Sequence, residues 1–313
     1  MRTSAQDFVW DRHRHALAVL DHVDSSAPPI SPTGASVPTR DAPIGGRPYP
    51  SMMRPSELSA PLVAHGIESD GCVGIERLLG RDQIGALIAG IDHAFDGFDG
   101  FQSTDRDDDE WFEPFIPGQG MVHVTRDWLR RGGGMFAADS PPLLQLWLST
   151  LHQAGIVDLV RDLFGETPLT SLDKCSLRRI DPSSPVAGIE WHQDGSFIGI
   201  ENRPLNLWVA LTDCAVSPGL EMLPRRLDGV VETGTRGATY DWSVGADLVA
   251  DLAATSPVVR PELDAGDAFL FDGLLLHRTA QPTPAMKTTR YAIETWFFRP
   301  SSFPRQQEVP LSF

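Results

Sequence analysis

A change of pattern near residue 166 constrains the fold of this chain more than any other feature. After that position, short segments with two-residue alternation or with aromatic and β-branched residues follow one another, separated by Gly, Pro and Asp. They include TSLDKCSLRRI, EWHQDGSFIGI, PLNLWVALTD, GLEMLP, DAFLFDG, LLLHRTA and RYAIETWFFRP. Many short strands in series are typical of a sandwich or jelly roll. The second half of the chain is therefore predicted to form a β core.

The chain before this point carries helical patterns instead. The stretch GRDQIGALIAGIDHAF has apolar residues at helical spacing, and SPPLLQLWLSTLHQAGIVDLVRDLFG predicts one or two helices. Ser140 is suited to cap the second stretch, with two prolines in its first turn. Residues 96–120 have the composition of a loop. Helices followed by strands indicate an α+β protein with a β core.

The first part of the chain differs from both halves in composition. Residues 4–23 are consistent with one helix, and residues 24–57 are rich in Pro, Ser and Gly, as in a linker or an extended arm. We therefore expect an arm over residues 1–57 and one domain over residues 58–313. Within that domain, residues 58–165 should be mainly helical, and residues 166–300 should form the β core.

Charge and hydropathy exclude several kinds of partner. The formal net charge is −16, so phosphate backbones and anionic lipid surfaces should repel the chain. No apolar run approaches the roughly 20 residues that span a bilayer. The N-terminus lacks the apolar stretch and cleavage site of a signal peptide. We expect a cytoplasmic protein with neither a nucleic-acid nor a membrane partner, and the sequence leaves the oligomeric state unknown.

The three cysteines, Cys72, Cys175 and Cys214, are widely separated and form no CxxC pair. An odd and sparse set argues against a disulfide framework and against a cysteine-based zinc site. Each is expected to be a buried free thiol.

The motif WHQDG places two metal-binding side chains, His192 and Asp194, two residues apart. In a strand, residues i and i+2 point to the same face, so both can reach one point inside a barrel. A later apolar segment, LLLHRT, supplies His277 as a third ligand. Two imidazoles and one carboxylate on one side of an ion leave positions open for a co-substrate and O2, as Fe(II) oxygenases require. Spacing alone balances this triad evenly against a structural role, because HxD is frequent by chance.

Thr279 and Arg290, which follow His277 in the chain, favour a metal site over a structural role. Arg290 begins the next strand-like segment, and a guanidinium can grip a carboxylate through two parallel hydrogen bonds. An anionic co-substrate on the metal needs such a cation deeper in the barrel, although Arg290 could also be one of many surface arginines. Thr279 lies two residues past His277, so strand alternation places its hydroxyl on the ligand face.

The segment PLNLWVALTD separates its side chains into two sets. Leu205, Leu207, Val209 and Leu211 form an aliphatic face that belongs in a core. Asn206 and Trp208 lie on the other face. They could line a polar cavity or face water in a half-buried strand, and the pattern favours neither.

Taken in order, these segments resemble the phytanoyl-CoA dioxygenase family of Fe(II)- and 2-oxoglutarate-dependent oxygenases. The similarity covers roughly residues 60–300, and it rests on DGCVGIERLL, WHQDGSF, LNLWVALTDC, GDAFLFDGLLLHRTAQ and the arginine that follows. It implies a double-stranded β-helix with helices packed outside. It also implies Fe(II) on His192, Asp194 and His277, and 2-oxoglutarate held by Arg290 with Thr279. Trp208, and with it Asn206, matches the neighbourhood of that co-substrate.

The chain departs from the family pattern at two places. Arg225 and Arg226 stand in GLEMLPRRLDG where members often have small residues, and they face either the substrate entrance or, preferably, solvent. The long stretch before residue 58 also lies outside the pattern. Members act on varied small molecules, so the resemblance gives a reaction type and leaves the substrate open.

The resulting hypothesis is a dioxygenase that uses O2 and 2-oxoglutarate to hydroxylate a small molecule, releasing succinate and CO2. Related halogenases have a small residue where Asp194 stands, so the aspartate favours oxygen transfer, with other oxidations still open. The alternatives are a cupin-like enzyme that does not use 2-oxoglutarate and a non-catalytic binding protein on the same fold.

Residues 96–136 are expected to border the cavity, because connecting loops often carry specificity. Their acidic run DRDDDEWFE is either a solvated loop or part of a lid with Gly132, Gly133 and Gly134 as its hinge.

Overall fold

The computed structural model describes residues 52–103, 129, 132–182, 190–214, 219–280, 284–305 and 308–313. Within these residues, seven strands form one sheet in the order β1-β2-β8-β6-β10-β5-β3. All neighbouring strands in it are antiparallel except β1 and β2. The strands are β1 (Met52–Met53), β2 (Cys72–Ile75), β3 (Gly134–Phe136), β5 (Cys175–Ile180), β6 (Leu205–Ala210), β8 (Ala268–Asp272) and β10 (Arg290–Phe297).

Strand alternation gives the large sheet two different faces. Leu207, Leu270 and Ile293 pack into one hydrophobic cluster, which we call the outer core. Their strand neighbours Trp208 and Phe269 belong to a second cluster on the opposite face, which we call the inner core. Both faces are buried, so residues i and i+1 of one strand serve different environments.

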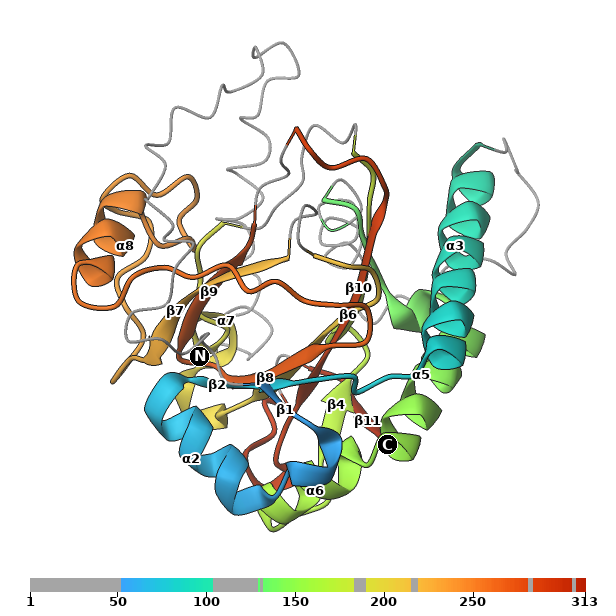
Figure 1. Cartoon of the computed structure of the whole chain (residues 1–313), viewed down its shortest axis with the longest axis horizontal. Coiled ribbons are helices and arrows are strands. Elements are labelled where there is room, and N and C mark those ends of the chain that lie inside the picture. Colours follow the sequence, from blue (N-terminus) through green and yellow to red (C-terminus); the bar gives the residue numbers. More distant parts are fainter. Residues whose placement is uncertain are drawn as a thin grey trace, which may run out of the picture.

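Four helices cover the outer face (Figure 1). The outer core contains the buried stripe of each helix, including Val63, Leu87, Trp147 and Val160. Gly71 ends the first helix in the left-handed conformation (φ 80°) and donates its N–H to the Ile67 carbonyl. The helices are α2 (Ala60–Asp70), α3 (Arg81–Ser103), α5 (Pro141–Gln153) and α6 (Ile156–Phe164).

A two-stranded sheet lies against the inner core. It pairs β7 (Leu220–Arg226) with β9 (Leu275–Thr279), and α8 (Ala246–Ala253) lies beside it in Figure 1. Leu220, Met222 and Leu275 pack against the inner face of the large sheet. The remaining elements are β4 (Leu169–Ser171) paired with β11 (Pro310–Ser312), α7 (Gly195–Ile198), and the 3-10 turns Pro55–Glu57, Ala137–Asp139, Ile200–Asn202 and Pro300–Ser302.

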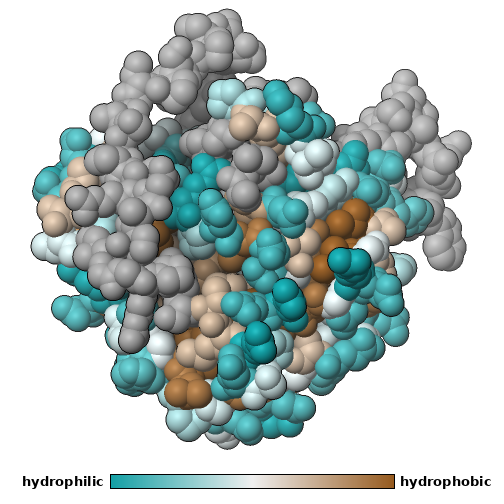
Figure 2. All heavy atoms as spheres, in the orientation of Figure 1, coloured by the Kyte–Doolittle hydropathy of each residue, from teal (hydrophilic) through white to brown (hydrophobic). Residues whose placement is uncertain are grey.

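The face of the molecule shown in Figure 2 is mainly hydrophilic. Hydrophilic side chains cover most of the coloured surface in Figure 2, and apolar ones form smaller groups between them. Across the residues that the structure describes, no helix is both long and apolar enough to cross a membrane. All three cysteines are buried and free, as expected from their spacing.

The coarse prediction of helices followed by a β-rich half is confirmed as a mixed fold with a large antiparallel sheet. Two local predictions are wrong. Residues 96–103 continue helix α3 instead of forming a loop, and EWHQDGSFIGI contains a turn and α7 instead of a strand. Gly134 begins β3, and Arg179 donates its N–H to the Gly133 carbonyl at 2.7 Å, so both glycines take part in sheet pairing rather than in a free hinge. The predicted helix at 4–23 and the acidic run at 105–113 lie outside the described residues.

Candidate metal centre

The structure brings His192, Asp194 and His277 together on the inner side of the molecule. One ligand atom from each lies within 4.8 Å of the others, and all three residues are buried. The two histidines face each other across an isolated antiparallel bridge, with reciprocal N–H to carbonyl bonds of 2.9 and 3.0 Å. This main-chain pairing sets the separation of their rings, whose centroids are 4.3 Å apart.

Asp194 reaches the cluster through a tight turn. Its backbone is helical (φ −57°, ψ −33°), and α7 begins at the next residue. The Gly195 N–H donates to the Gly273 carbonyl at 2.9 Å, and a Cβ on Gly195 would meet that same oxygen at 2.9 Å. The glycine of WHQDG therefore allows the turn to approach the β8–β9 connection, and the expected strand geometry at Asp194 is wrong although its convergence with His192 is right.

Backbone carbonyls orient both imidazoles. His192 Nδ1 lies 2.7 Å from the Glu190 carbonyl oxygen, and His277 Nδ1 lies 3.1 Å from that of Leu275. A carbonyl only accepts, so each Nδ1 carries the proton and each Nε2 presents its lone pair. The Nε2 atoms of His192 and His277 lie 3.6 and 3.9 Å from Asp194 Oδ1. Both rings thus have the tautomer and the orientation that metal ligation requires.

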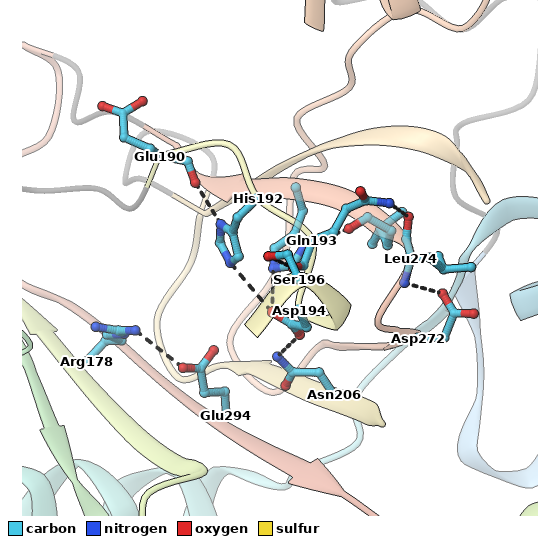
Figure 3. A network of polar contacts seen from close by, with 12 residues as sticks. Arg178, Glu190, His192, Gln193, Asp194, Ser196, Asn206, Asp272, Leu274 and Glu294 are labelled. Carbon is cyan, nitrogen blue, oxygen red and sulfur yellow. Dashed lines mark hydrogen bonds and ion pairs between the residues drawn. The ribbon is translucent and has the colours of Figure 1, made fainter. Parts of the chain in front are cut away.

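Gln193 fixes the turn from the opposite side. Its amide nitrogen donates to the Leu274 carbonyl at 2.8 Å (Figure 3) and to the Gly229 carbonyl at 3.2 Å. Its oxygen accepts the Val231 N–H at 2.7 Å. The side chain is almost fully buried. It therefore ties the two ligands that flank it to two other segments, a role that the sequence did not predict because its partners lie far away along the chain.

Burial shapes the protonation of the triad. It raises the pKa of Asp194 to about 6, an effect that nearby His277 and the hydrogen bond from Asn206 partly offset. Burial, together with His277, holds the pKa of His192 well below its ordinary value. A neutral imidazole is the form that binds metal, and a cation at this point would favour the ionised carboxylate. The donor set is therefore suited to a divalent ion.

Arg290 lies at the start of β10, on the inner face of the large sheet, and it is fully buried. None of its three guanidinium nitrogens has a hydrogen-bond partner among the described residues. Burial lowers the pKa of Arg290 to about 10, so the group still carries its charge at neutral pH. A buried cation without a counter-ion costs several kcal/mol. An anion bound against Arg290 would compensate this charge.

The other predicted residues surround this pair of sites. The Trp208 ring lies 5.8 Å from the Arg290 guanidinium carbon, and Thr279 is buried at the end of β9. Asn206 donates to Asp194 Oδ2 at 3.0 Å, while its own oxygen has no partner in the described part of the chain. Asn206 and Trp208 are both buried, so the face they share lines the interior and is not open to water.

The two arginines after β7's core do not reach the triad. Arg225 is exposed and donates to Thr255 at 3.1 Å, as the preference for solvent predicted. Arg226 instead donates to Asp272 at 2.6 Å and so braces the β8–β9 connection.

An ion pair near the triad was not expected from the sequence. Arg178 of β5 lies 3.3 Å from Glu294 of β10, and in Figure 3 Glu294 lies between Arg178 and Asn206. Glu294 follows Arg290 by an even number of residues on one strand, so alternation could have revealed it. Arg178 had no comparable signal.

Comparison with known proteins agrees with this geometry. The sequence matches the family described as Phytanoyl-CoA dioxygenase (PhyH) over residues 67–288, more than half of the chain. The chain therefore belongs to the phytanoyl-CoA dioxygenase family, which confirms the resemblance seen in its motifs. No curated protein matches it.

Solved structures share the fold at low identity. The non-heme alpha ketoglutarate dependent carbocyclase SnoK from nogalamycin biosynthesis is 17% identical with a TM-score of 0.52, over 80% of this chain and 87% of SnoK. EctD from S. alaskensis, solved with 2-oxoglutarate and 5-hydroxyectoine, is 18% identical with a TM-score of 0.54, over 89% of this chain and 88% of EctD. These likenesses concern the fold alone.

Proposed function

We propose that this chain is an Fe(II)- and 2-oxoglutarate-dependent dioxygenase that hydroxylates a small molecule. The observation that carries the proposal is the buried Arg290, whose guanidinium nitrogens have no hydrogen-bond partner among the described residues. It lies on the inner face of the large sheet, and β9, which carries His277 of the His–Asp–His cluster, packs against that face. A dicarboxylate would supply a counter-ion at one end and reach a metal at the other. The family membership supports the same reaction type.

The proposal extends to the architecture. The large sheet and the β7–β9 pair face each other across the inner core, as the two halves of a double-stranded β-helix would. The expected boundary at residue 58 is too late, because Met52 and Met53 form strand β1 and pair with β2 in the large sheet. The catalytic domain then includes residues 52–313, with the preceding residues as an arm before it.

Each residue has a role in this scheme. His192, Asp194 and His277 hold Fe(II), and the bound iron with 2-oxoglutarate supplies the oxidising chemistry, with succinate and CO2 as co-products. Arg290 binds the distal carboxylate of 2-oxoglutarate with two N–H donors, and Thr279 adds its hydroxyl. Trp208 forms a wall of that pocket and excludes water, while Asn206 orients the Asp194 carboxylate.

Asp194 bears on the outcome of the reaction. It fills a position at which a small residue would leave room for a halide, so oxygen transfer is favoured. The same fold also serves a carbocyclase, SnoK, and the fold alone therefore does not select hydroxylation.

The experiment measures 2-oxoglutarate binding to the protein by calorimetry under anaerobic conditions, with and without Fe(II). We expect binding that requires Fe(II), and succinate formation once O2 and a substrate are added. His277→Ala should abolish the iron dependence, and the exposed Arg225→Ala should serve as the matched control.

Two results would contradict the proposal. Turnover without 2-oxoglutarate, unchanged in Arg290→Lys, would favour a cupin-like enzyme of another kind. Iron and 2-oxoglutarate binding without turnover of any compound in a broad screen would favour a non-catalytic binding protein.

A further inference from the structure

Aromatic side chains gather at one place on the surface. Of the large hydrophobic side chains that are exposed in the described residues, the two aromatic ones are Phe197 and Tyr240, each about 40% accessible. Single exposed apolar residues are common and carry no meaning. These two are separated by many residues in sequence, yet both contact the half-buried Trp242.

The three rings form a continuous path that ends on a metal ligand. Tyr240 stacks on Trp242 with centroids 5.2 Å apart and an angle of 4° between the planes. Trp242 and Phe197 lie 5.8 Å apart, and each contacts the His192 ring, at 6.1 and 5.5 Å respectively. We call Phe197, Tyr240 and Trp242 the aromatic rim. A ring held against it would lie next to the reacting centre.

The backbone holds the rim in register with the triad. Phe197 belongs to the short helix that begins directly after Asp194. The segment that carries the other two rings is tied to the same motif, because the Val244 N–H donates to the Trp191 carbonyl at 2.7 Å. The Ser243 hydroxyl also closes the turn to Tyr240 at 3.0 Å. Such preorganised aromatic surfaces bind flat ligands with little loss of conformational entropy.

The segment that carries Tyr240 and Trp242 is acidic, which disfavours binding of polyanions. Between residues 228 and 247 the chain exposes four carboxylates, Asp228, Glu232, Asp241 and Asp247. The one basic residue of that stretch, Arg236, is already paired with Asp251 at 2.5 Å. The whole chain adds a net charge of −16. A coenzyme A thioester, with several phosphate charges, would be repelled from this acidic segment.

The inner wall offers a polar contact to the same ligand. Arg178 and Glu294 lie beside the triad and are largely buried, so they present a donor and an acceptor within reach of a group bound near Asp194 (Figure 3). A ring with a hydroxyl, carbonyl or amine substituent would satisfy both the rim and this pair.

We infer that the substrate of this enzyme is a flat, unsaturated ring compound without net negative charge, bound by the aromatic rim, and that it is not an acyl-coenzyme A. The inference rests on the proposed oxygenase function, and it identifies the substrate class of that same site. The inferred class differs from the compound in the family's name, because the rim is aromatic and the segment that carries Tyr240 and Trp242 is acidic.

The test uses three probes on the full chain loaded anaerobically with Fe(II) and 2-oxoglutarate. They are 2-naphthol, its saturated counterpart decahydro-2-naphthol, and palmitoyl-coenzyme A, with binding read by calorimetry and by quenching of tryptophan fluorescence. We expect 2-naphthol to bind about tenfold more tightly than the saturated ring, and palmitoyl-coenzyme A not to compete with it.

Variants separate the rim from the rest of the protein. Phe197→Leu and Trp242→Ala should each weaken 2-naphthol binding by about threefold to tenfold, since aromatic pairs contribute roughly 0.5–1.5 kcal/mol. Both should leave 2-oxoglutarate binding intact. Leu62→Ala, which removes an exposed side chain of α2, should bind 2-naphthol as the wild type does.

Tight binding of palmitoyl-coenzyme A, or wild-type binding of 2-naphthol by both rim variants, would overturn the inference. The same samples distinguish it from the function on which it rests. Rim-dependent 2-naphthol binding without iron-dependent 2-oxoglutarate binding would contradict the oxygenase function. Iron-dependent 2-oxoglutarate binding without rim-dependent 2-naphthol binding would contradict only the substrate class.

Discussion

The two faces of the large sheet are built from the same strands and follow different rules. On the outer face, Leu207, Leu270 and Ile293 meet the helices in an aliphatic core whose only requirement is close packing. On the inner face, the same strands bury Asn206 and Arg290, and some of their polar atoms lack partners in the described part of the chain. Adjacent residues of one strand thus have different roles. The outer face stabilises the fold, and the inner face holds buried polar groups that lower stability and form the binding site.

The largest effect should come from replacing the charge on the inner face. Arg290→Met keeps the volume of the buried side chain and removes its cation, so 2-oxoglutarate binding should weaken by at least roughly 100-fold. The free energy of unfolding without ligand should be unchanged or about 1 kcal/mol higher, because an uncompensated buried charge is removed.

Calorimetry and thermal unfolding measure these two quantities, and Arg225→Met controls for loss of a surface arginine. A variant that lost stability and kept its affinity for 2-oxoglutarate would show that the two faces are not divided in this way.

The matching change on the outer face is Leu207→Ala. It should lower the free energy of unfolding by about 2–5 kcal/mol, through lost burial and the cavity left behind. Iron affinity of the folded fraction should not change, since Leu207 points away from the triad. Denaturant unfolding and an iron titration below the unfolding transition measure both, and a large drop in iron affinity would contradict the separation of the faces.

The next residue back, Asn206, gives the converse test on the same strand. Asn206→Ala removes the hydrogen bond to Asp194, so iron affinity should fall about 10- to 100-fold, as for other residues that orient ligands. The loss of stability should stay below about 2 kcal/mol. Equal iron affinity in variant and wild type would mean that the turn alone positions Asp194.

The smallest effect is expected at the β4–β11 edge, which belongs to neither face. Burial, with Asp173 close by, raises the pKa of Glu308 to about 8 although Lys174 lies 3.1 Å away. An acid whose pKa is raised by folding favours the folded state at low pH and loses that contribution as pH rises from its unfolded pKa, near 4.5, to about 8.

Glu308→Gln in the iron-loaded protein should therefore flatten the decline of thermal stability between pH 5 and 8. Glu76→Gln, at a partly exposed glutamate, should leave the slope as in the wild type. A slope that is equally steep in Glu308→Gln would show that another group titrates in this range.

Strand periodicity carried much of the prediction of the inner face. It placed Asn206 and Trp208 on one side of a strand, Thr279 on the side of His277, and Arg290 at the start of β10. A two-residue period is a local property, so it is readable without knowing the partners of a strand. The order of helices and strands was readable for the same reason.

Features that depend on distant contacts were not readable. The turn at Asp194 exists because Gly195 packs on Gly273, and Gln193 matters because of carbonyls in two other segments. The aromatic rim joins two segments that no local pattern connects. The glycines and aspartates of residues 96–103 favour a loop, but helix α3 continues through them to Ser103.

Reciprocal main-chain hydrogen bonds join residues 192 and 277, so the backbone positions of the two histidine ligands do not depend on their side chains. Side chains at these two positions can change without loss of the pairing that sets their separation, because the pairing uses only backbone atoms. Metal preference can therefore evolve by single substitutions on a scaffold that is already assembled. The backbone thus fixes where the ligands stand, and the side chains at a few positions determine which metal is bound.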